Sequence, residues 1–165
     1  MPLAYGKHSP QEMLAKAERD LARLEAAETS QKTDELSDAL LNFAVSVTSV
    51  KHWLKEQPNA AFTPADVERY VSASIALSSF RDIANEGKHR VIRRYVPTTQ
   101  DTLVSGTIVT VVLKSEKRAP QSHGPHVFFR LKIIRKDGSR HRAVQLGRVA
   151  IHEWQSFMRQ YGLIA

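Results

Sequence analysis

Cysteine is absent from this chain of 165 residues, which excludes a disulfide framework and thiolate metal sites. The first residues, MPLAYGKHSPQEML, contain no continuous apolar segment of the kind that a secretory signal needs. No apolar run approaches the roughly 18 to 20 residues that a bilayer-spanning helix requires. We therefore expect a cytoplasmic protein that does not enter a membrane.

Glycine is sparse as well, since the 7 glycines are scattered and form no phosphate-binding loop. The sequence also contains no Gly-x-Ser-x-Gly nucleophile elbow and no spacing typical of metal ligands. These absences lead us to expect neither a metal nor a small-molecule cofactor.

Charge is distributed unevenly along the chain. Residues 1–87 contain 9 Lys/Arg and 13 Asp/Glu, whereas residues 88–165 contain 15 and 4. The net charges of the two halves are thus −4 and +11, within a total of +7. This asymmetry favours a polyanionic partner such as RNA, or the acidic half of a second copy. A cationic surface that only aids solubility is the alternative.

The first half has the composition and periodicity of helices. Apolar residues recur at helical spacing in 9–28, 33–56 and 63–86, and each segment begins with residues that cap helices. Serines within the third segment allow a break, and Gly87 stands where a left-handed helix cap is expected. We expect residues 1–95 to form a helical bundle.

Residues 96–165 are expected to form a second domain that packs as one unit with the bundle. Two stretches, 103–114 and 126–136, have the composition of strands, and Asp137-Gly138 is a strong hairpin signal leading into 139–146. The segment 148–161 has the apolar stripe of an amphipathic helix. The predicted fold class is therefore α+β: a helical bundle, a small three-stranded antiparallel sheet and a C-terminal helix.

A two-residue turn at Asp137-Gly138 fixes the pairing of the last two predicted strands. It places Lys132 opposite Ala143, and it leaves a basic outer sheet face that carries Arg130, Lys132 and His141. A basic face of this kind can hold nucleic-acid phosphates, but cations on a sheet also discourage edge-to-edge aggregation. Both interpretations remain open.

The stretch FRDIANEGKHR, residues 80–90, is the strongest candidate for a chemical site. On a helix, one side carries apolar residues, and the other carries Ser78, Asp82, Asn85 and His89 with Arg81 and Lys88 beside them. A carboxylate near a histidine suits general acid–base catalysis, and a cation can hold a phosphate. The same residues also describe an ordinary helix end, whose cations interact favourably with the helix dipole. The residues alone leave open whether the protein is an enzyme.

Two motifs together carry a family resemblance. NFAVSVTSVKHWL contains Asn42, Phe43 and Trp53, and the later stretch contains Asp82, Asn85, Lys88 and His89. This combination resembles small bacterial and phage proteins of the HEPN-like helical-bundle class. The resemblance implies a homodimer and a metal-independent ribonuclease site, in which Arg81 is the motif arginine, Asp82 its polar neighbour and His89 the catalytic histidine.

The leading hypothesis is thus a HEPN-like, RNA-directed protein, such as a ribonuclease of a defence or toxin system. In it, His89 is the base, Arg81 contacts the phosphate, and Asp82 and Asn85 orient the base. The cations expected to bind nucleic acid are Lys88, Arg90, Arg93, Arg94, Arg130 and Lys132. The alternative is a non-catalytic module that dimerises, or that binds nucleic acid or an acidic protein.

Overall fold

The computed structural model describes residues 9–30, 33–89, 107–115, 127–135 and 137–165. Within these ranges, residues 33, 86–89, 107–115 and 127–130 are described by their backbone alone. The predicted domain boundary between residues 95 and 96 lies outside the described residues. In the part of the chain that is described, no helix combines the length and the apolar character needed to cross a membrane.

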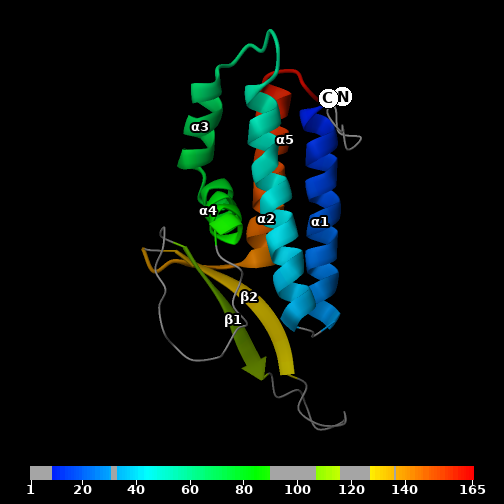
Figure 1. Cartoon of the computed structure of the whole chain (residues 1–165), viewed down its shortest axis with the longest axis vertical. Helices are drawn as coiled ribbons and strands as arrows, with labels where there is room; N and C mark the ends of the chain where they lie inside the picture. The colour runs from blue at the N-terminus through cyan, green and yellow to red at the C-terminus, as the bar shows by residue number, and fades with distance from the viewer. Residues whose placement is uncertain (1–8, 31–32, 90–106, 116–126, 136) are drawn as a thin grey trace.

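The described residues are mostly helical, and their five helices pack around one apolar core. Figure 1 shows three long helices side by side along the long axis of the molecule, with two shorter ones beside them. The long helices are α1 (Pro10–Ser30), α2 (Thr33–Lys55) and α5 (Ala143–Gln160), and the shorter ones are α3 (Pro64–Ala73) and α4 (Ile75–His89).

Side-chain oxygens cap the starts of α1 and α3 as the sequence predicted. Ser9 Oγ accepts a hydrogen bond from the Glu12 amide at 3.2 Å, and Thr63 caps α3 with a complete capping box. The expected break falls at Ser74, whose Oγ accepts from the Leu77 amide at 2.9 Å and so caps α4. The expectation that Gly87 ends the helix is wrong, because α4 continues to His89.

Large side chains from helices far apart in the sequence meet in the core. The rings of Phe43 on α2 and Phe80 on α4 pack edge to face, with centroids 4.8 Å apart. On α5, Trp154 is 1% exposed and donates from Nε1 to the Val47 carbonyl at 2.9 Å. Gly147 lets α5 approach closely, since a Cβ there would lie 2.7 Å from Leu21 Cδ1 on α1.

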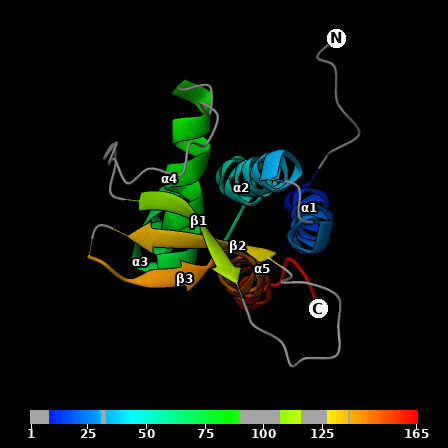
Figure 2. The same ribbon diagram turned by 90° about the horizontal axis from the view of Figure 1, so that it is seen from below.

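The sheet is in essence a two-stranded antiparallel ribbon. Strands β1 (Thr107–Ser115) and β2 (Val127–Arg135) pair along nine residues each, whereas β3 (Arg140–Arg142) adds only three residues. Strand β1 lies against α4, and β2 lies against α1 and α5 (Figure 2). The predicted α+β fold with a three-stranded sheet is therefore wrong, although its helical part agrees with the structure.

The pairing of β3 differs from the prediction because the hairpin loop is one residue longer. The Arg135 amide donates to the Ser139 carbonyl at 2.9 Å, and the Gly138 amide donates to the Arg135 carbonyl at 2.9 Å. Gly138 has φ +82, the left-handed conformation that three-residue hairpin loops require at this position. Lys132 consequently pairs with Arg142 and not with Ala143.

The rest of the predicted third strand belongs to α5. This helix begins at Ala143 and not near residue 148, since the apolar residues that follow recur at helical spacing. Its buried positions on the first turns are Ala143, Val144, Leu146, Gly147, Ala150 and Ile151. Burial of this stripe against the bundle stabilises a helix at the expense of a longer strand.

Candidate functional site

The polar row of helix α4 is the set of residues predicted to lie opposite its core residues: Ser78, Asp82, Asn85 and His89, with Arg81 and Lys88 beside them. Phe80, Ile83 and Ala84 are buried, Arg81 and Asp82 are partly buried, and Asn85 is exposed. Helix α4 includes His89, which follows Asp82 by seven residues and thus falls almost in line with it. The side chains of Lys88 and His89 lie outside the described part of the chain.

Arg81 and Asp82 form an ion pair beside the end of α3. Both Nε and Nη2 of Arg81 lie 3.3 Å from Asp82 Oδ1, and Nη1 lies 3.3 Å from Ser72 Oγ. The two side chains are 26% and 19% exposed, so each remains reachable from solvent. The contacts with Asp82 and Ser72 hold the Arg81 guanidinium in one direction. Its solvent-exposed side is then the side that can contact an anion.

Ser78, which the helical projection put in the polar row, is 5% exposed. Arg135 at the end of β2 covers it: its Nη1 donates to Ser78 Oγ at 3.1 Å, to Ser79 Oγ at 2.7 Å and to the Ile75 carbonyl at 2.9 Å. Helical spacing alone does not reveal a covering side chain that comes from a strand more than fifty residues away. Arg135 thus joins the ribbon to the start of α4.

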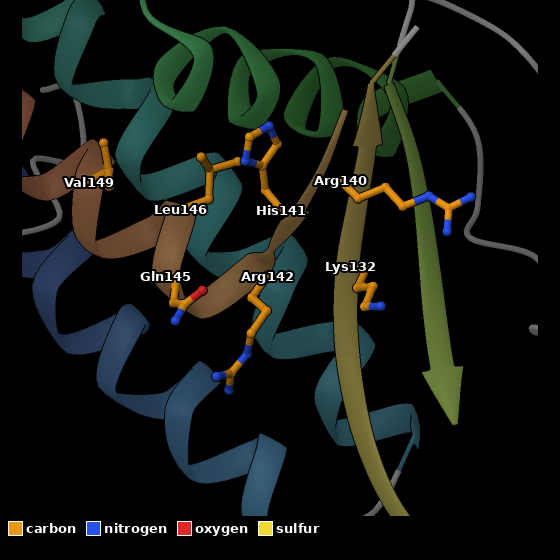
Figure 3. Close-up of a pocket in the computed structure, with 7 residues that line it drawn as sticks. All are labelled: Lys132, Arg140, His141, Arg142, Gln145, Leu146 and Val149. Carbon is orange, nitrogen blue, oxygen red and sulfur yellow. The ribbon is translucent and has the colours of Figure 1, made fainter. Parts of the chain in front are cut away.

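A second polar feature is an open pocket of ≈ 290 Å³ between the strands and the start of α5 (Figure 3). Its lining includes three cationic side chains and no carboxylate. The residues that line it are Lys132, Arg140, His141, Arg142, Gln145, Leu146 and Val149.

The pairing of β3 determines on which face of the sheet the cations of this pocket lie. Lys132 on β2 lies directly opposite Arg142, and Arg140 is two residues from Arg142, so all three fall on one face of the sheet. The two-residue loop expected from the sequence would put His141 on that face instead, because a shift of one residue in register exchanges the two faces of a strand. Of this group only Lys132 was predicted to bind nucleic acid.

The other predicted nucleic-acid contacts fall outside what the structure describes. Arg90, Arg93 and Arg94 are outside the described residues, and so are the side chains of Lys88 and Arg130. Among the described residues, no group of three histidines, aspartates or glutamates could hold a metal ion.

No protein-family model matches this sequence, and neither a curated protein nor a solved structure matches it. The fold and site together define a mostly helical chain with a polar row on α4 and a basic pocket beside α5.

Proposed function

We propose that the protein is a HEPN-like, RNA-directed protein whose α4 polar row is a metal-independent ribonuclease site. The observation that carries this proposal is the Arg81–Asp82 pair, held on the solvent side of α4 in line with His89. Arg81 then contacts a substrate phosphate, and Asp82 with Asn85 orients the histidine. The site works in a homodimer, with Arg90, Arg93 and Arg94 drawing RNA toward it.

The proposed reaction is an internal transfer at an RNA phosphate. His89 removes the proton of a ribose 2′-hydroxyl, whose oxygen attacks the adjacent phosphorus. The bond from phosphorus to the 5′-oxygen of the next nucleotide breaks, and that oxygen takes up a proton from water, while the protonated His89 releases its proton to water. The products are a strand ending in a 2′,3′-cyclic phosphate and a strand starting with a 5′-hydroxyl. Arg81 stabilises the negative charge that develops on the phosphate oxygens.

The test compares cleavage of single-stranded RNA by the wild-type protein and by His89→Ala, in buffer that contains a metal chelator. General acid–base catalysis typically accounts for a factor of about 10² to 10⁴, so His89→Ala should be slower by at least about 100-fold. His152→Ala is the matched control, since His152 is an exposed histidine on α5. Equal cleavage by the wild type and His89→Ala would contradict the catalytic role.

One observation favours a second candidate, a module that binds nucleic acid or an acidic protein without catalysis. Asp82 already neutralises the charge of Arg81, which a substrate phosphate would otherwise engage. In this case the wild type binds single-stranded RNA in a filter assay but leaves it intact. His89→Ala then binds as well as the wild type, and that result separates binding from catalysis.

A further inference from the structure

The pocket beside α5 concentrates positive charge that the protein itself neutralises only in part. Arg142 Nη2 lies 3.4 Å from Glu28 Oε2 on α1, and the Arg142 side chain is 36% exposed. Among the described residues, Lys132 and Arg140 have no carboxylate partner. Like charges directly opposite each other on a sheet face are destabilising, so the pairing of Lys132 with Arg142 is unfavourable without an anion between them.

Protection of a sheet edge explains only part of this group of cations. Arg140 and Arg142 stand on β3, which is an edge strand, as charged residues that block aggregation do, whereas Lys132 is on β2, which has a partner strand on each side. The Nε atom of Arg142 is also buried without a hydrogen-bond acceptor, and Oε1 of Glu28 is buried without a donor. A guanidinium placed only for solubility would keep its nitrogens in water.

The remaining walls of the pocket differ in character from its cationic side. Val149 is 47% exposed and supplies most of the apolar surface at the start of α5, whereas Leu146 is largely buried beside it. His141, whose Nε2 lies 3.3 Å from Ser139 Oγ, and the amide of Gln145 add groups that can form hydrogen bonds. A few cations beside an apolar wall fit a phosphate that carries an organic ring better than a bare anion.

We propose that this pocket binds the terminal phosphate of a nucleotide. The phosphate lies beside Lys132, and the nucleoside lies on Leu146 and Val149. The Arg140 and Arg142 side chains point away from each other in Figure 3, and both turn toward the phosphate when it binds. The volume of ≈ 290 Å³ is at the small end of ligand pockets, which suits a single nucleotide unit. The nucleotide is either free in solution or the phosphorylated end of an RNA strand. This binding does not depend on the ribonuclease activity proposed for α4.

Calorimetric titrations of the whole protein test the proposal with adenosine 5′-monophosphate, adenosine and inorganic phosphate. The monophosphate should bind at least about tenfold more tightly than either fragment, because only it uses both the cations and the apolar wall. Binding of adenosine as tight as that of the monophosphate would overturn the assignment. A hexanucleotide RNA, with and without a 5′-phosphate, then distinguishes the two sources of the nucleotide. If the phosphorylated strand has a lower Kd than the monophosphate, the ligand is the end of an RNA strand; if the monophosphate has the lower Kd, the ligand is a free nucleotide.

Variants connect the binding to these side chains. Arg140→Ala should raise the Kd for adenosine 5′-monophosphate by about tenfold, the effect of losing one charge-assisted hydrogen bond. Arg19→Ala is the matched control, since Arg19 is an exposed arginine on α1, and it should leave the Kd unchanged. An equal Kd for both variants would show that the pocket is not the site. Arg140 is exposed, so its replacement should not unfold the protein.

His89→Ala separates this inference from the proposed ribonuclease. It should bind adenosine 5′-monophosphate as the wild type does, because His89 is not among the residues that line the pocket. Intact binding together with absent RNA cleavage by the wild type would leave the pocket assigned and the ribonuclease refuted. A large loss of monophosphate binding in His89→Ala would instead contradict the pocket as a separate site.

Discussion

Asp20 is a buried carboxylate, 2% exposed, that joins α1 to α2. Lys16 and Ser46 donate hydrogen bonds to its Oδ2, and Arg23 donates to its Oδ1 at 2.6 Å. Burial on its own would raise the pKa of Asp20, but the hydrogen bonds from Lys16 and Ser46 and the charge of Lys16 outweigh it. The pKa is therefore lowered from the usual 3.8 in the folded protein.

This lowered pKa predicts a stability contribution that disappears in acid. The contribution is complete above the unfolded-state pKa near 3.8 and is lost as the pH falls through the lower pKa of the folded state. Asp20→Asn should cost about 1–3 kcal/mol of unfolding free energy at pH 7, as expected for a buried hydrogen-bonded charge. The gap between wild type and variant should then narrow below about pH 4.

Denaturant unfolding at pH 7, 5 and 3 measures this gap. Asp38→Asn is the matched control, because Asp38 is exposed on α2 and its replacement should change stability by less than about 0.5 kcal/mol. A gap for Asp20→Asn that stays constant from pH 7 to pH 3 would disagree with an ionised Asp20 in the folded state.

At the scale of the secondary-structure elements, the starts of α1 and α3 could be predicted from the sequence, whereas the extent of the third strand and the start of α5 could not. Capping residues such as Ser9 and Thr63 act on amides three residues away, so local sequence determines where a helix starts. The Asp137-Gly138 signal also marked a real turn, but hairpin loops of two and three residues both use a glycine with positive φ. Sequence alone does not distinguish a two-residue loop from a three-residue loop, and the register of β3 depends on this difference of one residue in loop length.

The contact between the ribbon and α4 gives a prediction at this scale. Arg135→Ala removes the hydrogen bonds to Ser78, Ser79 and the Ile75 carbonyl, and should lower the unfolding free energy by about 1–3 kcal/mol. Thermal unfolding followed by circular dichroism measures the loss, with Arg19→Ala as an exposed arginine control. Arg135→Ala unfolding at the same temperature as Arg19→Ala would mean that Arg135 does not hold the ribbon.

At the scale of the whole molecule, the two candidate sites differ in how much of each could be predicted from the sequence. The row from Arg81 to Asn85 lies on one helix, so its spacing alone puts the side chains together. The pocket combines Lys132 with Arg140 and Arg142 from another strand, and the start of α5 completes it. The charge asymmetry indicated that the second half attracts anions, but only the strand pairing shows that these three cations share one face of the sheet.

The asymmetry leads to a prediction about RNA binding by the whole protein. Cations that contact phosphates release counterions, so the logarithm of the binding constant should fall linearly with the logarithm of the salt concentration. The slope is about −0.7 for each phosphate contacted on a single strand, so the one terminal phosphate bound in the pocket contributes about −0.7. Replacing Lys132 by Gln and Arg140 by Ala together should make the slope shallower by about 0.7, because that phosphate is no longer bound. Filter binding between 50 and 200 mM salt measures both slopes, with Arg19→Ala as the control. Binding that does not change with salt would exclude phosphate contacts as its source.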